Sequence, residues 1–118
     1  QPKEVEACKA AHEGKTPMAL VLDNVHVDGT FTAVHCNHTD PKLLSRFTSM
    51  GGVVCICPLT EGNLGDGIIQ VPSACSGSIC IGTDCNARID LFEELRWLEY
   101  TQRLHKLRRG MAVESSPA

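Results

Sequence analysis

Three segments of the sequence carry side chains that could take part in hydrolysis. His35 and His38 follow one apolar run, and Asp84 ends another in the stretch ICIGTDCN. A third apolar run is followed by PLTEGNLGDG (58–67), a segment that combines carboxylates with glycines. Imidazole and carboxylate groups that lie close together can bind a metal ion or move a proton during hydrolysis. Such chemistry requires a fold that brings these segments to one place.

Each of these residues also has a purely structural interpretation. His35 lies in an apolar strand pattern, where a histidine is commonly a core residue with one satisfied nitrogen. His38 neighbours a helix cap and fits a surface position, whereas Asp84 precedes a helix that it could cap. The glycine-rich segment lacks the spacing of a phosphate-binding loop. Only joint placement at one edge of a sheet favours a functional pair of His35 and Asp84.

The sequence alternates between helix and strand patterns, which predicts an α/β fold. The expected elements, in order, are helices at 2–14 and from 16 onward, a strand at 31–36, a helix at 40–50, a strand at 53–57, a loop at 58–67, a short helical or irregular stretch near 69–76, a strand at 78–83 and a helix at 87–109. Strands that alternate with helices pair in parallel, and right-handed crossovers bring their carboxyl ends to one edge. Sites in such sheets lie beyond that edge, so His35, the 58–67 loop and Asp84 are expected to meet there.

Length and charge narrow the class of protein. The 118 residues fit one domain, expected at 1–112, followed by a polar, disordered tail at 113–118. The net charge of −3 gives no reason to expect nucleic acid or an anionic membrane as a partner, and no segment has the length of a membrane span. The N-terminal residues lack a secretory apolar region, which favours a cytoplasmic location.

The seven cysteines are an odd number without a CxxC pair, which excludes a complete disulfide framework. Free and mostly buried thiols are therefore expected. Cys55 and Cys57 point to one face of a strand and could begin a soft metal site. Because no second close pair accompanies them, small core residues are the favoured interpretation.

Four segments together resemble a known family. They are, in order along the chain, VHCNHTD, GGVVCICPLTEGNLGDGI, IGTDCN and EELRWLEYTQRL. In the order and spacing of these segments, the chain resembles formimidoylglutamate deiminases, which are metal-dependent (β/α)8 barrels of the amidohydrolase superfamily. The resemblance covers residues 4–112. It implies a partial (β/α)8 barrel, in which three parallel βα units follow N-terminal helices. It also implies zinc-dependent hydrolysis of a formimino C–N bond with release of ammonia.

The resemblance implies roles for the residues singled out above. Asp84 would ligate the metal and take a proton from its bound water. His35 would hydrogen-bond the nucleophile and stabilise the tetrahedral intermediate. The loop after the second strand would shape the substrate pocket through Thr60, Glu61, Asn63, Gly65 and Asp66.

The sequence also departs from a complete member of that family. It contains neither a His-x-His nor a His-x-x-Glu motif, which supply three metal ligands and the proton-shuttling acid. A (β/α)8 barrel needs about 250 residues. We therefore expect the last three βα units of such an enzyme, truncated, inactive and without zinc as an isolated chain. The alternative is a non-catalytic α/β domain derived from that enzyme, which associates with itself or binds a small molecule.

Three parallel strands leave two open sheet edges, and the last helix carries two apolar stripes. Leu91, Leu95 and Leu98 form one stripe, which could cover the sheet. The second stripe consists of Trp97, Tyr100, Leu104 and Leu107 and needs another partner. Exposed strand edges and apolar faces favour association, so a homo-oligomer is expected, most simply a two-fold dimer.

The first testable prediction concerns this association. Light scattering at micromolar concentration should give twice the mass of one chain, because open edges and the second stripe of the last helix would be buried together. A clean monomer at that concentration would contradict the expectation.

Overall fold

The computed structural model describes residues 1–71, 78–85 and 88–110. Its elements, in order, are α1 (Pro2–Ala11), α2 (Pro17–Asn24), β1 (Thr32–Val34), α3 (Pro41–Ser49), β2 (Val53–Ile56), α4 (Pro58–Leu64), β3 (Ile79–Ile81) and α5 (Leu91–Lys106). The expected 113–118 tail and most of the stretch expected near 69–76 lie outside the described residues. Within the described ranges, no helix has both the length and the apolar character needed to cross a membrane.

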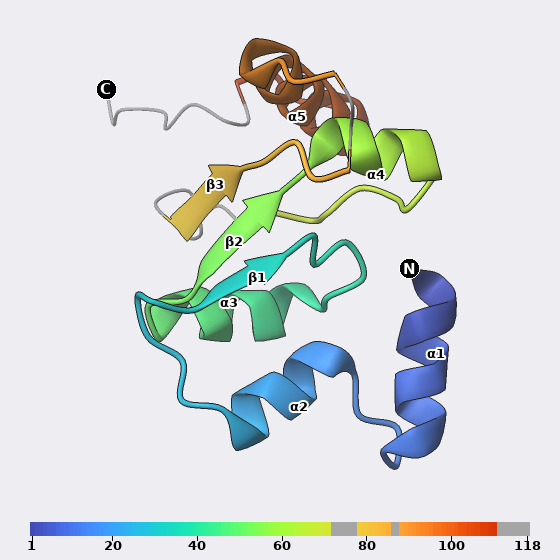
Figure 1. The fold of residues 1–118 in the computed structure, drawn as a ribbon, viewed down its shortest axis with the longest axis vertical. Coiled ribbons are helices and arrows are strands. Elements are labelled where there is room, and N and C mark those ends of the chain that lie inside the picture. Colours follow the sequence, from blue (N-terminus) through green and yellow to red (C-terminus); the bar gives the residue numbers. More distant parts are fainter. Residues whose placement is uncertain (72–77, 86–87, 111–118) are drawn as a thin grey trace.

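The three strands form one parallel sheet in the order β1-β2-β3, which confirms the expected α/β fold. Val34 pairs with Cys55, and Cys55 pairs with Cys80 on the other side. Because the pairing is parallel, the strands point the same way and end at one edge (Figure 1). The sheet therefore brings the segments after β1, β2 and β3 together.

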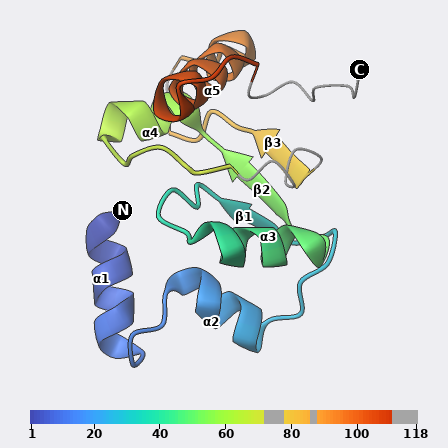
Figure 2. The ribbon, with the colours of Figure 1, turned by 180° about the vertical axis from the view of Figure 1, so that it is seen from behind.

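The core lies on one face of the sheet. Val54 and Ile56 are almost fully buried there, and Leu44 and Phe47 of α3 join them in one apolar cluster. On the opposite face, Val34 remains 51% exposed. Figures 1 and 2 show α3 beside β1 and β2 with α2 below α3, and α4 and α5 together near β3, while α1 stands apart and buries none of its residues. This one-sided packing suits a segment of a closed barrel, whose second face would line the interior.

The segment after β2 was expected as a loop, and this expectation is wrong for its first seven residues, which form α4. Pro58 occupies the first helical position, where its missing N–H costs nothing. Gly65 ends the helix with a left-handed φ of 70°. Gly62 lies inside the helix despite its poor helix propensity, and the Trp97 ring of α5 packs over it. Tertiary packing therefore outweighs the glycine-rich composition.

The last helix is shorter than expected at both ends. Asp90 caps it by accepting hydrogen bonds from the backbone N–H groups of Phe92 and Glu93, and Leu107 ends it with a φ of 52°. The expectation that Leu91, Leu95 and Leu98 cover the sheet is also wrong, since Leu91 and Leu95 remain 54% and 47% exposed. The buried face of α5 instead consists of Glu94, Leu98 and Gln102, spaced one turn apart.

Two polar groups on this face connect α5 to its neighbours. Glu94 is fully buried, and its Oε2 accepts a 2.8 Å hydrogen bond from the backbone N–H of Leu59 at the start of α4. Gln102 donates from Nε2 to the carbonyl oxygen of Ile69 at 2.9 Å. Both partners are backbone groups that the helices and loops leave free.

The second testable prediction concerns the close approach of β2 to α3. A Cβ atom at Gly52 would lie 2.4 Å from the ring of Phe47, which is 0% exposed and has no room to move. We expect Gly52→Ala to lower the free energy of unfolding by about 1–3 kcal/mol, the usual cost of overpacking, as measured by urea denaturation.

Gly29→Ala is the matched control, because nothing lies within 4 Å of its added Cβ. Its effect should stay within about 0.5 kcal/mol. Equal stability of the two variants would contradict the described contact between Gly52 and Phe47.

Candidate active site

Three side chains meet where the strands end. His35, directly after β1, lies with Nδ1 3.1 Å from Oε1 of Glu61 on α4. Its Nε2 lies 3.6 Å from Oδ2 of Asp84, which follows β3. The first distance is a hydrogen bond, and the second is a contact beyond hydrogen-bond range that is an ion pair only when the imidazole is protonated. The imidazole therefore lies between two carboxylates, one on each side of the ring.

The backbone around this group is strained. His35, Cys36 and Asp84 have φ angles of 69°, 58° and 50°, in a region that residues other than glycine seldom adopt. Such conformations cost about 1–3 kcal/mol each and cluster at functional sites. The turn at His35 is held by its N–H, which donates to the carbonyl oxygen of Cys55 at 2.8 Å. The distortion therefore coincides with the two residues predicted to do the chemistry.

The structure removes one alternative for Asp84. Asp90, and not Asp84, caps α5, so the helix-cap interpretation of Asp84 is wrong. The side chain of Asp84 is 39% exposed, as is that of His35. His35 is thus not a core histidine, and both side chains can be reached from solvent.

Sequence reasoning missed the contact between Glu61 and His35. Glu61 was expected at the substrate, but its side chain is only 5% exposed and lies beside His35. Its Oε1 also accepts a hydrogen bond from the backbone N–H of Cys57 at 3.0 Å. The available signal was a glutamate four residues after Cys57, a spacing at which one helical turn brings its carboxylate back near the end of the preceding strand.

The other residues expected to bind substrate are not gathered around one space. Thr60 is 1% exposed, and its hydroxyl donates to the carbonyl oxygen of Thr83 at 2.8 Å, which joins α4 to the turn before Asp84. Asn63 and Gly65 are exposed on α4 and at its end. Asp66 does approach the end of β1, since its carbonyl oxygen lies 2.8 Å from Nε2 of His38.

A cavity of about 440 Å³ opens at the end of β1 between α1 and the turn after α4. His35, His38 and Asp66 line it, together with Glu4 of α1. Its place at the carboxyl edge of a parallel sheet is where ligands bind in folds of this type. This cavity therefore reaches His35 of the candidate site, whereas Asp84 is not among its lining residues.

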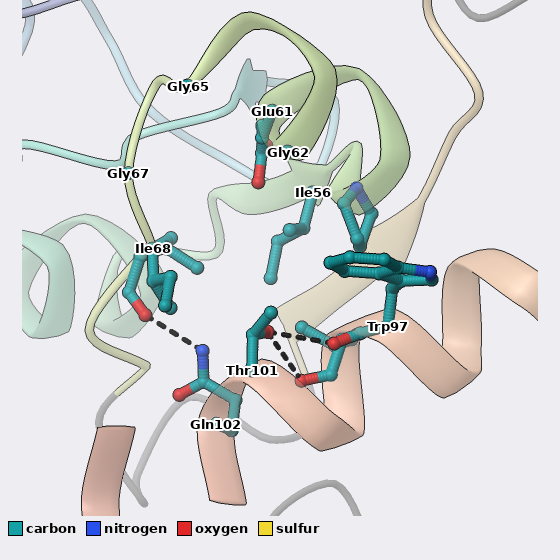
Figure 3. Close-up of a pocket in the computed structure, with 12 residues that line it drawn as sticks. Ile56, Glu61, Gly62, Gly65, Gly67, Ile68, Trp97, Thr101 and Gln102 are labelled. Atoms are coloured by element: carbon teal, nitrogen blue, oxygen red, sulfur yellow. Dashed lines mark hydrogen bonds between the residues drawn. The ribbon is translucent and has the colours of Figure 1, made fainter. Parts of the chain in front are cut away.

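A second cavity, of about 330 Å³, lies between α4 and α5 (Figure 3). Ile56, Ile69, Leu98 and Trp97 give it a mostly apolar lining. Glu61 also lines it, but neither His35 nor Asp84 does. Figure 3 shows the hydrogen bonds within α5 and from Gln102 to the loop after α4 that frame this space.

Burial raises the pKa of two groups beneath the site, Glu61 and Cys57. It raises the pKa of Glu61, an effect that the hydrogen bonds from Cys57 N–H and His35 partly offset. Burial, followed by the neighbouring Cys55 and the negative charges of Glu61 and Asp84, raises the pKa of Cys57 to about 12. Cys57 is therefore a neutral thiol at physiological pH and a core residue as expected, whereas Cys55 is only partly buried.

The residues present do not by themselves make a zinc site. Within residues 1–71, 78–85 and 88–110, no three His, Cys, Asp or Glu side chains are grouped so that they could hold a metal ion. Zinc sites use three or four protein ligands, whereas the expected donor set of this chain is Asp84 alone. The thiols of Cys55 and Cys57 do not extend that set.

A comparison with protein-family models assigns the chain to a family. The sequence model of the amidohydrolase family matches residues 1–116. The chain belongs to the amidohydrolase family. Metal dependence is general in this family, although the described residues alone do not complete a metal site.

Two comparisons with individual proteins agree with this assignment. The chain is 40% identical over 112 residues to the formimidoylglutamate deiminase of Pseudomonas aeruginosa PAO1, a match that covers 93% of this chain and 24% of that protein. It superposes with a TM-score of 0.90 on the crystal structure of an amidohydrolase from Brucella melitensis, at 32% identity, covering 99% of this chain and 26% of that one. The chain therefore spans about a quarter of the length of these relatives and has the fold of part of an amidohydrolase barrel.

The third testable prediction concerns the reactivity of the thiols. A pKa of about 12 leaves Cys57 almost entirely protonated at pH 8, and the thiolate is the form that reacts. Alkylation by iodoacetamide at pH 8, followed by peptide mass spectrometry, should modify Cys57 at least about 100-fold more slowly than the exposed Cys80.

Unfolding in urea is the control, because it should make the two rates similar. Equal rates in the native protein would contradict both the burial and the raised pKa of Cys57.

Proposed function

We propose that this chain forms the catalytic carboxyl edge of the last three βα units in a hydrolase of the formimidoylglutamate deiminase type. The single observation that carries the proposal is the position of His35, held against Glu61 and facing Asp84 at the ends of parallel strands. The 40% identity to a formimidoylglutamate deiminase supports the substrate class. The substrate would be an N-formimino amino acid.

The reaction needs a group that moves protons and a group that stabilises the intermediate. Water adds across the carbon–nitrogen double bond of the formimino group, and the bond to the departing nitrogen then breaks. The water oxygen remains on carbon as a formyl oxygen, and both water protons end on the nitrogen, which leaves as ammonia. Asp84 would accept a proton from the water and deliver it to that nitrogen, while His35 Nε2 would hydrogen-bond the tetrahedral intermediate.

We propose that the 118 residues alone do not carry out this reaction. The expected metal donor set consists of Asp84, and the sequence lacks the two histidine motifs that a complete member has. Activity would then require the preceding part of a barrel, which provides the other groups and covers the open face of the sheet.

The fourth testable prediction is complementation. The chain should be co-expressed with the portion of the Pseudomonas aeruginosa enzyme that lies outside its match, and ammonia release from N-formimino-L-glutamate should be measured. We expect release by the pair and none by the chain alone. Asp84→Asn should abolish the release, because the amide cannot accept the proton.

Asp23→Asn is the matched control, since Asp23 is an exposed carboxylate on α2 that pairs with Lys15, just before that helix. It should leave the rate unchanged. A pair that is equally active with either substitution would contradict the role proposed for Asp84.

A second candidate function is self-association of a non-catalytic domain. The exposed apolar residues of α5 favour it, since Trp97, Tyr100 and Leu104 are 45%, 53% and 76% exposed. Isolated apolar residues are common on surfaces, but a stripe along one helix is typical of an interface. A stable dimer, together with the absence of ammonia release in every pairing, would favour this function over catalysis.

A further inference from the structure

Glu61 occupies an unusual position for a residue of a substrate pocket. Its side chain is 5% exposed, whereas those of His35 and Asp84 are each 39% exposed. Glu61 lines the cavity between α4 and α5, whereas His35 lines the cavity at the end of β1. Glu61 is therefore not among the residues that line the cavity at His35.

The oxygen that contacts His35 is itself held by the backbone. Oε1 of Glu61 accepts from the N–H of Cys57 at 3.0 Å and lies 3.1 Å from Nδ1 of His35. Cys57 follows β2 and occupies the N-cap position of α4, so this acceptor is fixed where the two elements meet. α4 is in turn held by Glu94 through Leu59 N–H and by Thr60 through Thr83 O.

A fixed carboxylate determines where the imidazole carries its proton. A neutral imidazole has one N–H donor and one acceptor nitrogen, and an adjacent acceptor selects the donor. Because carboxylate oxygen accepts, the N–H lies on Nδ1 and the lone pair of Nε2 faces Asp84 and the solvent. Rotation of the ring would break the hydrogen bond to a buried anion, which costs more than the loss of an exposed one.

We propose that Glu61 is a positioning residue, which holds the ring orientation and the Nδ1–H tautomer of His35 without touching the substrate. This replaces the substrate-binding role expected for Glu61 from the sequence. The structural part of the proposal stands on the geometry of this chain. Its catalytic consequence rests on the proposed deiminase function.

The experiment that tests the structural part is nitrogen NMR of the histidine rings in the 15N-labelled chain. At about pH 9, well above the ordinary titration range of imidazole, the spectrum should show His35 with its proton on Nδ1. A His35→Gln variant assigns the signal. A wild-type ring protonated on Nε2 overturns the proposal without the need for any Glu61 variant.

Substitutions then test the cause. Glu61→Leu removes the acceptor, and the His35 signal should change from one tautomer to a mixture. Glu61→Gln keeps an acceptor oxygen and should restore the Nδ1–H signal. Asp23→Asn is the control, because it removes an exposed carboxylate of α2 that is paired with Lys15 and takes no part in holding α4. An unchanged tautomer in Glu61→Leu, or the same change in Asp23→Asn, overturns the proposal.

The catalytic part is tested in the co-expressed pair described above. Glu61→Leu should lower kcat by about 10- to 100-fold, the range for partners that orient a site imidazole, with KM nearly unchanged, and Glu61→Gln should recover part of the loss. A raised KM with unchanged kcat would indicate direct substrate binding and overturn the positioning role. Absence of activity in every pair would contradict the proposed function alone, since the NMR result does not depend on turnover.

Discussion

The candidate site depends on one buried acceptor, the Oε1 atom of Glu61. This oxygen binds the backbone N–H at the end of β2 and contacts the imidazole at the end of β1. A buried carboxylate is stable only when hydrogen bonds compensate for the lost hydration, so the position of each partner is constrained by the other. The contact thereby links two neighbouring strands and the helix that follows them. Its geometry sets the position of His35 with respect to Asp84, which arrives from the third strand.

Strain and burial are distributed unevenly around this acceptor. The distorted backbone lies at His35, Cys36 and Asp84, while the residues beneath them are in regular, well-packed strands. Well-packed strands with strained residues at their ends are the usual arrangement when side chains must be held in one orientation. Cys57 belongs to these packed residues, because its raised pKa keeps the thiol neutral and unreactive at physiological pH.

The sequence was sufficient for the architecture, since apolar runs separated by helix signals predict parallel strands whose ends meet. The juxtaposition of His35 and Asp84 follows from that topology. The glycine-rich composition of residues 58–67 wrongly predicted a loop at α4, where the packing of Trp97 over Gly62 stabilises a helix. The apolar periodicity was likewise wrong on α5, whose buried face is marked by Glu94 and Gln102 instead of a leucine stripe. Both errors have the same cause, because the contacts that decide each outcome come from residues distant in sequence.

The two polar anchors of α5 have a consequence for the uniqueness of the fold. An apolar helix face can slide along its neighbour by one turn, about 5.4 Å, and still bury similar surface. Here such a slide would move Leu98 to the place of Glu94 and leave the N–H of Leu59 without an acceptor. The carbonyl oxygen of Ile69 would lose its donor at the same time. α5 therefore has a single axial register, selected by two backbone groups on other segments of the chain.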